Sequence, residues 1–274
     1  MENWFTELHT KDTGISIKVA KPIYTKFSKY QRIDIFQNKT LGRILTLDGL
    51  IQLTESDEFI YHEMLVHPSL VVHPTCEEVL VVGGGDGGTA REALKHNQCR
   101  IDLVEIDEAV MKACIKFFPT LSLSLSDERV KLFTEDGTKF TKKKKSKYDV
   151  IIVDSTDPIG FAKELFRAQF YKSCYSALKE NGILVAQSES PILHRGIMKG
   201  MYKNLSAIFP IVQFYLVPIP TYPSGLWSFV FCSKKYQPLE FAREVNFTTK
   251  YYNLEIHKAS FALPNFVKDI FNSD

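Results

Sequence analysis

The sequence has few cysteines, and none of them form the pairs that hold metals or redox disulfides. Its 274 residues include five cysteines, which are scattered, odd in number and without a C-x-x-C motif. This spacing argues against a disulfide framework and against a cysteine zinc site. Four of the five lie in or beside apolar segments, where we expect buried thiols. The five are Cys76, Cys99, Cys114, Cys174 and Cys232.

Long apolar runs and a large charge excess are also missing. No apolar run reaches the roughly 18 residues of a membrane span, and the first twelve residues mix both charges without a signal-peptide core. We therefore expect a cytoplasmic protein. The 34 Lys and Arg exceed the 32 Asp and Glu by only two, so the charge balance predicts neither nucleic acid nor membrane as a partner. We interpret the lysines at 142–145 and Lys147 as an exposed turn between a helix and a strand.

The remaining composition is that of a globular protein, with 45% hydrophobic and 24% charged residues. Residues 15–53 contain short β-prone runs separated by turn residues such as Asp48-Gly49, which predicts a small antiparallel sheet. Apolar residues then recur at helical spacing over 56–72, with Asp57 and Glu58 in the first turn. We expect an N-terminal β-sheet domain over 1–55 and a catalytic α/β domain over 56–274.

Buried strands alternate with helices from residue 78 onward. This alternation predicts a mostly parallel, Rossmann-type α/β sheet with helices on both faces. Residues 211–220 and 226–233 are joined by TYPSG without a helix. We expect these two runs to form a hairpin that places an antiparallel strand at one edge of the sheet. That arrangement is typical of S-adenosylmethionine methyltransferase-like enzymes and not of dinucleotide-binding folds.

The most informative motif is VLVVGGGDGG at residues 79–88. Gly83, Gly85 and Gly88 fit G-x-G-x-x-G, a weak signal by itself, in which a glycine turn after a buried strand approaches an anionic ligand. Asp86 would repel such an anion. We therefore expect a nucleoside ligand that carries a cationic group.

Acidic residues also end the next strands. Glu105 stands where an acid commonly binds ribose hydroxyls, although a surface acid is the alternative. Asp136, which Gly137 follows, could bind the adenine amino group or could cap a helix. Asp154 ends the fourth strand. Because ligands of open α/β sheets bind at the carboxyl ends of the strands, we expect these acids and Asp86 to share one crevice.

Several carboxylates in one crevice repel each other unless the ligand is cationic, as a sulfonium with an amine would be. Ordinary S-adenosylmethionine also carries a tail carboxylate, which Asp86 would oppose. Decarboxylated S-adenosylmethionine has only the ammonium there, so Asp86 favours the decarboxylated form.

The segment DSTDP at 154–158 lies where methyltransferases place substrate-facing residues. Asp154 and Asp157 could serve as base and anchor, and an Asx-type turn before Pro158 is the alternative. Attack by an amine beside a sulfonium expels a neutral thioether, so the reaction needs an unprotonated amine but no metal. The pKa of an amine near 10.4 and that of an Asp near 3.9 differ by roughly six units in water. Burial narrows this difference, because it raises the pKa of the carboxylate and lowers the pKa of the amine.

Aromatic walls would exclude water from such a site and stabilise cations. The candidates are Tyr61, Tyr222, Trp227 and Trp4. The run HEMLVH resembles the zinc motif H-E-x-x-H, but its second histidine, His67, stands one residue too far from His62 to share a helix face. We expect no metal.

A longer series of motifs resembles the polyamine aminopropyltransferase family, and most closely the spermidine synthases, over nearly the whole chain. The series is LDGLIQLTESDEFIYHEM, GGGDGG, VEID, EDG, DSTDPIG, LVAQSESP, IPTYPSGLWSF and YYNLEIHKASFALP, in that order. The resemblance implies transfer of the aminopropyl group from decarboxylated S-adenosylmethionine, a co-substrate, to putrescine. It also implies a homodimer or homotetramer, no permanently bound cofactor and a lid after DSTDPIG.

The resemblance also implies a role for each matching residue. Asp154 is the general base, with Tyr61 orienting the amine. The implied nucleoside contacts are Gln31, Gly83, Asp86, Glu105, Asp136, Gly137 and Phe161. The implied amine contacts are Tyr61, His62, Asp86, Asp154, Asp157, Gln187 and Tyr222.

One position departs from the family pattern D-P-x-G-P-A, because Phe161 replaces its second proline and adds apolar bulk to the lid. Other functions remain open at this point. They are transfer to agmatine, cadaverine or spermidine, methyl transfer, and non-catalytic binding of a nucleoside or polyamine.

Overall fold

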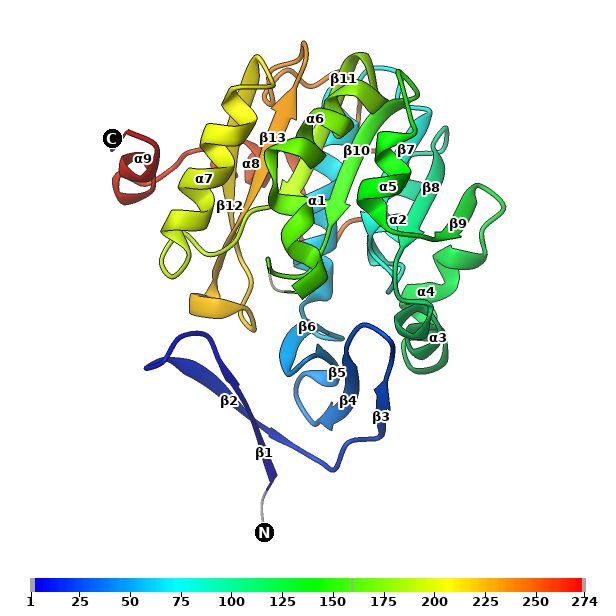
Figure 1. Cartoon of the computed structure of the whole chain (residues 1–274), viewed down its shortest axis with the longest axis vertical. Coiled ribbons are helices and arrows are strands. Elements are labelled where there is room, and N and C mark those ends of the chain that lie inside the picture. Colours follow the sequence, from blue (N-terminus) through cyan, green and yellow to red (C-terminus); the bar gives the residue numbers. More distant parts are fainter. Residues whose placement is uncertain (1–2, 159, 273–274) are drawn as a thin grey trace.

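The computed structural model describes residues 3–158 and 160–272, and its N-terminal part consists of two small antiparallel sheets (Figure 1). The antiparallel structure predicted over 15–53 is confirmed, although it is divided between two sheets and begins earlier, at Asn3. The two-stranded sheet joins β1 (Asn3–Leu8) and β2 (Gly14–Val19). The four-stranded sheet has the order β3 (Tyr24–Phe27), β4 (Arg32–Asn38), β5 (Gly42–Leu47) and β6 (Leu50–Thr54).

A seven-stranded sheet forms the body of the α/β part, in the order β12-β13-β11-β10-β7-β8-β9. The predicted fold class is confirmed, since β7 to β11 are parallel and β13 is antiparallel to both neighbours. In one detail the prediction is corrected. The reversed strand β13 lies one place inside the edge, because β12 pairs along its outer side. The strands are β7 (Glu78–Gly83), β8 (Arg100–Glu105), β9 (Val130–Thr134), β10 (Tyr148–Asp154), β11 (Leu178–Gln187), β12 (Ile211–Pro218) and β13 (Leu226–Ser233).

Helices cover both faces of this sheet (Figure 1). Strand β7 shows why, because Val79 and Val81 contribute to one apolar cluster while Leu80 and Val82 contribute to the other. One face packs against α1 (Glu58–Val72), α2 (Gly88–Leu94) and α8 (Leu254–Ser260). The other packs against α5 (Gly137–Lys142), α6 (Ala168–Ala177), α7 (Arg195–Ser206) and α9 (Asn265–Asn272). The remaining short helices are α3 (Glu108–Phe117), α4 (Pro119–Ser122), η1 (Leu123–Ser126), η2 (Gly160–Phe166) and η3 (Pro223–Gly225).

Helix α1 connects the two parts and carries several site residues. Every residue from Tyr61 to Val72 is buried, so the helix is enclosed on all sides and not only along one stripe. It contacts α2 and strands β10, β11 and β12. The four-stranded sheet packs its Ile33 and Ile35 against α3. These contacts place the N-terminal sheets beside the carboxyl ends of the parallel strands.

Three composition-based predictions can be compared with the fold. All five cysteines are free and buried. The lysine cluster follows α5 as a turn before β10, and there Lys143 pairs with Glu135 and Lys147 with Asp102. Among the described residues, no helix combines the length and apolarity that crossing a membrane requires.

Candidate active site

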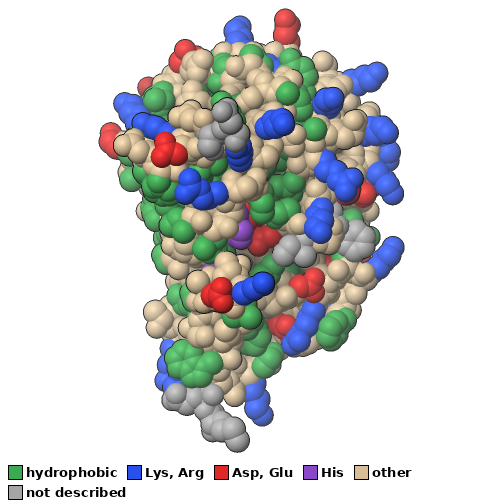
Figure 2. Space-filling view, turned by 60° about the vertical axis from the view of Figure 1, so that its left-hand side comes forward, with side chains coloured by type: hydrophobic (Ala, Val, Ile, Leu, Met, Phe, Trp, Pro, Cys, Tyr) green, Lys and Arg blue, Asp and Glu red, His purple; other side chains and the backbone are tan. Residues whose placement is uncertain are grey.

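A pocket of about 500 Å³ lies between the N-terminal sheets and the carboxyl ends of the parallel strands. Figure 2 shows histidine and acidic side chains on the floor of a recess. The structure brings together in this pocket all the predicted site residues whose side chains it describes. They are Gln31, Tyr61, His62, Gly83, Asp86, Glu105, Asp136, Gly137, Asp154, Asp157, Gln187 and Tyr222.

The other suggested residues have different outcomes. Phe161 lies in η2, but its side chain is outside the described part of the structure. Trp227 lines the pocket as suggested. The suggestion for Trp4 is wrong, because this residue lies in β1 with 57% of its surface exposed and does not line the pocket.

The glycine-rich loop allows close approach of protein groups. Gly83 has φ +88°, and a Cβ atom there would lie 1.9 Å from the carbonyl oxygen of Asp154, its neighbour in the β7–β10 register. At Gly88 a Cβ atom would lie 2.3 to 2.5 Å from the His62 ring. Gly83 therefore lets β10 approach the end of β7, and Gly88 lets His62 approach the start of α2.

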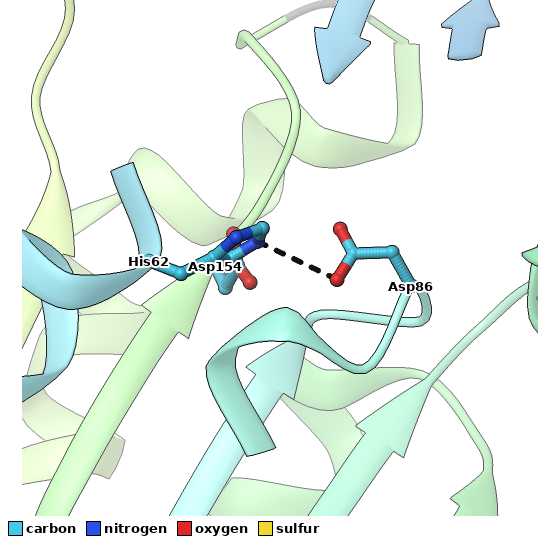
Figure 3. A group of neighbouring side chains, drawn as sticks. All are labelled: His62, Asp86 and Asp154. Atoms are coloured by element: carbon cyan, nitrogen blue, oxygen red, sulfur yellow. Dashed lines mark ion pairs between the residues drawn. The ribbon is translucent and has the colours of Figure 1, made fainter. Parts of the chain in front are cut away.

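Asp86 occupies the turn between β7 and α2. Its Oδ1 accepts a hydrogen bond from the backbone N–H of Gly88 at 2.6 Å and lies 3.5 Å from His62 Nε2. Figure 3 shows His62, Asp86 and Asp154 facing one another. A ring nitrogen of His62 and one carboxylate oxygen of each aspartate lie within 4.8 Å of one another. The two carboxylates of this group fit a small cation such as an ammonium group.

Asp154 accepts a hydroxyl hydrogen bond on each carboxylate oxygen. Tyr61 Oη donates to Oδ1 at 2.8 Å, and Thr89 Oγ1 donates to Oδ2 at 2.6 Å. Burial and then the charge of Asp86 raise the pKa of Asp154, against the opposing effects of His62 and the two hydroxyls. The raised pKa has the direction that a base for an amine requires. Sequence reasoning missed Thr89, although it directly follows the GGGDGG motif.

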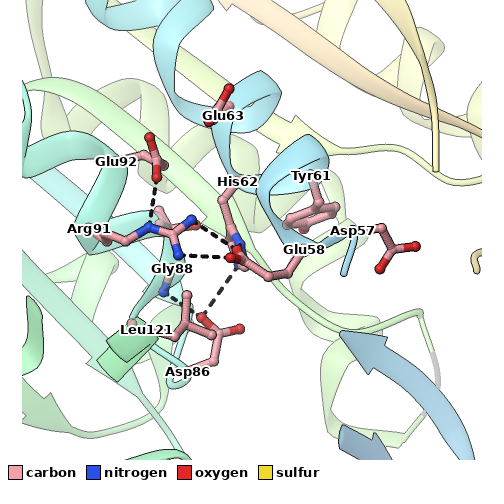
Figure 4. Close-up of polar contacts among 12 residues, drawn as sticks. Asp57, Glu58, Tyr61, His62, Glu63, Asp86, Gly88, Arg91, Glu92 and Leu121 are labelled. Atoms are coloured by element: carbon pink, nitrogen blue, oxygen red, sulfur yellow. Dashed lines mark hydrogen bonds and ion pairs between the residues drawn. The ribbon is translucent and has the colours of Figure 1, made fainter. Parts of the chain in front are cut away.

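His62 is the end of a chain of charged groups (Figure 4). Its Nδ1 lies 2.6 Å from Glu58 Oε2, and Arg91 donates two hydrogen bonds to Glu58, at 2.8 and 2.9 Å. Burial opposes a charge on His62, but Asp86 and Glu58 outweigh burial and raise the pKa of His62 well above its usual value. Burial also disfavours ionised Glu58, whereas His62 and Arg91 lower its pKa to about 2. Sequence reasoning missed Glu58 and Arg91, although Glu58 precedes His62 by one helical turn.

At the carboxyl end of β8, Glu105 is buried. It accepts a hydrogen bond on Oε1 from the backbone N–H of Asp107 at 2.8 Å. Burial raises the pKa of Glu105 to about 7. Gln31 donates its side-chain amide to Asp107 at 3.1 Å, which links the four-stranded sheet to the end of β8.

Asp136 is a helix cap that also lines the pocket. Its Oδ1 accepts from the backbone N–H groups of Thr138 at 2.8 Å and Lys139 at 3.4 Å, at the start of α5. Burial opposes ionisation, but a hydrogen bond from the Thr138 hydroxyl at 2.6 Å and these two backbone hydrogen bonds prevail and lower the pKa of Asp136. The capping interpretation is therefore confirmed, and it does not exclude contact with a ligand, because the side chain also borders the pocket.

Asp157, Gln187 and Tyr222 also line the pocket. Tyr222 donates its hydroxyl to the Gln52 carbonyl oxygen at 2.6 Å. Burial and then Glu189 raise the pKa of Asp157 to about 7. Glu7 of β1 also lines this pocket, and burial raises its pKa to about 7. Sequence reasoning missed Glu7, because nothing in its local sequence points to a site.

The HEMLVH run does not form a zinc site on one helix face. His67 Nε2 lies 3.0 Å from Glu92 Oε2, and its Nδ1 lies 3.1 Å from His96 Nε2. His62 is directed instead toward Glu58 and Asp86. The two histidines therefore serve different networks, as their five-residue spacing predicted.

Gly88→Ala is expected to destabilise the protein by about 1–3 kcal/mol, because the new methyl group would overlap the His62 ring, which Glu58 holds in place. Urea unfolding measures the effect. Gly200→Ala in α7 is the matched control, since a Cβ atom there meets nothing within 4 Å and alanine favours a helix. Equal stability of the two variants would contradict the steric argument.

Comparison with known proteins identifies the family of this chain. Residues 58–243 match the family model described as spermine/spermidine synthase domain, and residues 3–55 match the one described as spermidine synthase tetramerisation domain. The polyamine aminopropyltransferase of Clostridium botulinum is 48% identical over 282 residues, covering 100% of this chain and 99% of its own. The chain belongs to the spermine/spermidine synthase family. This assignment confirms the predicted aminopropyltransferase enzyme class.

Further relatives agree. The polyamine aminopropyltransferase of Caldicellulosiruptor bescii is 50% identical over 273 residues, covering 98% of each chain. A spermidine synthase in complex with the transition-state analogue AdoDATO has a TM-score of 0.96 and 44% identity, covering 98% of this chain and 95% of that one. The spermidine synthase of Thermotoga maritima has a TM-score of 0.94 and 44% identity, covering 98% and 94%. The similarity therefore extends over both the N-terminal sheets and the α/β part.

Proposed function

We propose that this protein is a spermidine synthase, which transfers the aminopropyl group of decarboxylated S-adenosylmethionine to putrescine. The single observation that carries the proposal is the group of His62, Asp86 and Asp154 at the ends of β7 and β10. A ring nitrogen of His62 and a carboxylate oxygen of each aspartate lie within 4.8 Å of one another. An ammonium bound by Asp86 would hold the donor's propyl chain beside Asp154. The AdoDATO complex of the similar spermidine synthase supports a nucleoside donor.

Asp154 is the proposed general base. The amine nitrogen forms a bond to the carbon beside the sulfonium, the carbon–sulfur bond breaks, and neutral methylthioadenosine leaves. The proton of the attacking amine passes to Asp154. Tyr61 and Thr89 hold the carboxylate in place through its two oxygens, and the buried surroundings bring its pKa closer to that of the amine.

The nucleoside would bind at the opposite side of Asp86 from the amine. We assign Glu105 to the ribose hydroxyls, and Gln31, Gly83, Asp136, Gly137 and Phe161 to the rest of the nucleoside. Asp157, Gln187, Tyr61, His62 and Tyr222 would line the amine channel. Two acids with pKa values raised to about 7, Glu7 and Asp157, border the pocket and would attract the second ammonium of a diamine. This fits a diamine acceptor such as putrescine, and agmatine, cadaverine and spermidine, which also carry a second cationic group, remain the acceptors to compare with it.

Assembly and domain division belong to the same proposal. The match of residues 3–55 to a tetramerisation domain supports a homotetramer, with a homodimer as the alternative. We place the boundary between the N-terminal and catalytic domains at residues 55 and 56, between β6 and α1.

A turnover assay tests the proposed reaction. The purified protein is incubated with decarboxylated S-adenosylmethionine and each acceptor in turn, and methylthioadenosine release is measured. We expect the highest kcat/KM with putrescine. Release only with another acceptor would change the substrate, and no release with any acceptor would refute the proposed function. Methyl transfer from S-adenosylmethionine would support the alternative enzyme class.

Asp86→Asn is expected to weaken discrimination against S-adenosylmethionine. The amide removes the charge that attracts the ammonium and repels the tail carboxylate, so the ratio of the two affinities should fall by about 10-fold or more. Competition of both nucleosides against labelled methylthioadenosine measures the ratio. Methylthioadenosine lacks the charged tail and should bind both proteins alike. An unchanged ratio would show that Asp86 does not select the donor.

A further inference from the structure

His62 carries its charge at the place where a cationic ligand is expected to bind. Its Nε2 lies 3.5 Å from Asp86 Oδ1, and its Nδ1 lies 2.6 Å from Glu58 Oε2. The side chain of His62 is 3% exposed, so bulk water does not stabilise its charge. Its charge is therefore balanced by these two carboxylates and by Asp154, which belongs to the same cluster.

The partners of the two ring nitrogens of His62 differ in how firmly they are held. On the Nδ1 side, Glu58 is fixed by two hydrogen bonds from Arg91. On the Nε2 side, Asp86 faces the pocket and keeps 17% of its side-chain exposure. The Nδ1 proton is thus held by Glu58, which Arg91 fixes, whereas the Nε2 proton faces Asp86 at the pocket (Figure 4).

A second cation at Asp86 would compete with this Nε2 proton. An imidazolium and an ammonium at the same carboxylate repel each other, because both are within contact distance of one charge. Neutral imidazole with its proton on Nδ1 removes the repulsion and presents the Nε2 lone pair as an acceptor. An ammonium donates three hydrogen bonds, so it can use Asp86 and Nε2 together.

We propose that His62 is a proton placeholder, which keeps the empty site electrically balanced and releases its Nε2 proton when the ammonium of the donor binds at Asp86. Glu58 and Arg91 are positioning residues that hold the Nδ1 proton and the ring orientation. The donor keeps its own ammonium proton, and the proton from Nε2 passes to bulk solvent. Each donor molecule that binds therefore releases about one proton. This inference rests on the proposed function, because it takes decarboxylated S-adenosylmethionine as the ligand.

The titrating groups that face His62 come from each element packed around it. Glu58 lies on its own helix, Asp86 on the turn after β7, and Asp154 at the end of β10. Arg91 on α2 acts through Glu58. The Tyr61 ring meets the imidazole edge-on at 5.4 Å and stays protonated, because burial raises its pKa well above the usual value.

Calorimetric titration in buffers of different ionisation enthalpy counts the released protons. Decarboxylated S-adenosylmethionine is compared with methylthioadenosine, which shares the nucleoside but has neither the ammonium nor the sulfonium charge. The titrations are made at pH 8, above the pKa of about 7 of Glu105, so that nucleoside contacts contribute little. We expect the donor to release about one proton more than methylthioadenosine.

Two variants assign the proton to its source. In Asp154→Asn the difference should persist, since His62 still titrates. In His62→Gln it should fall to near zero. A difference near zero in the unaltered protein, persistence in His62→Gln, or loss in Asp154→Asn would each overturn the proposal.

If His62→Gln does not fold, ¹⁵N NMR of the unaltered protein decides the question. The Nε2 signal should change from the protonated to the unprotonated position when the donor binds and stay protonated with methylthioadenosine. An Nε2 that remains protonated with donor bound would overturn the proposal. Failure of the donor to bind, while methylthioadenosine binds, would refute the proposed function instead.

Discussion

Asp154→Asn is expected to lower turnover by about 10²- to 10⁴-fold, the usual contribution of a general base. The amide has nearly the same shape as the carboxylate but cannot accept a proton from the amine. Methylthioadenosine affinity should change little, because Glu105 and Asp136 contact the nucleoside from other strands in the proposed arrangement. Single-turnover release of methylthioadenosine and calorimetric binding measure the two effects separately.

A control on the same strand separates chemistry from folding. Asp149 lies at the opposite end of β10 and accepts backbone hydrogen bonds from Glu77 at 3.0 Å and Glu78 at 2.9 Å. Asp149→Asn should reduce stability but leave the turnover of folded molecules near normal. The base assignment would fail if Asp154→Asn lost nucleoside binding while its residual chemistry remained unchanged.

The pH dependence of turnover is a second test of whether Asp154 is the base. Burial, followed by Asp86, raises the pKa of Asp154. The base is inactive when protonated, so turnover should rise with pH as Asp154 loses its proton. This acidic limb should disappear from the residual activity of Asp154→Asn. Persistence of the same limb would assign the titration to another group.

The carboxyl ends of the strands could be predicted from sequence because short apolar runs mark the strands directly. Gly83, Glu105 and Asp154 each end a strand, and parallel pairing of β10, β7 and β8 brings these ends to one edge. The convergence of acids in one pocket follows from this topology alone. The acids at the strand ends could therefore be predicted without side-chain geometry, whereas residues such as Gln31, His62 and Gln187 were predicted only from the family resemblance.

The charge balance of the site could not be predicted in the same way. Sequence shows the acids, but the partner of Glu58 is Arg91, 33 residues later on another helix. Glu7 reaches the pocket from β1, a strand that was not predicted, and its Oε2 accepts a hydrogen bond from the backbone N–H of Ile51 at 2.7 Å. These contacts depend on tertiary packing, which leaves no periodic pattern in the sequence. The helix predicted over 56–72 also gave no indication of the contacts that Glu63 makes.

Glu63 fixes an irregular segment of the chain onto α1. Its Oε1 accepts from the backbone N–H of Lys250, and its Oε2 accepts from those of Tyr251 and Tyr252, all at 2.8 Å. Glu63 is 1% exposed. Three consecutive N–H groups thus surround one buried carboxylate. The segment has no strand or helix of its own, so these bonds replace the backbone pairing that regular structure would supply.

Glu63→Ala is expected to lower the free energy of unfolding by about 4–5 kcal/mol or more, because it removes three hydrogen bonds to a charged group and each contributes about 1.5–3 kcal/mol. The loss leaves several backbone donors without their partner and opens space beside α1. Urea unfolding followed by circular dichroism measures the change. Glu255→Ala is the control, since Glu255 is an exposed acid in α8, and it should change stability by less than about 1 kcal/mol.

The consequence for the site should be much smaller than the consequence for stability. Figure 4 shows Glu63 directed away from Asp86, whereas the preceding residue His62 points toward it. The segment around Tyr251 does not line the pocket. Folded Glu63→Ala protein should therefore bind methylthioadenosine nearly as well as the unaltered protein at a temperature below its unfolding transition. A loss of affinity with little loss of stability would instead make Glu63 part of the site, and it would contradict the anchoring role.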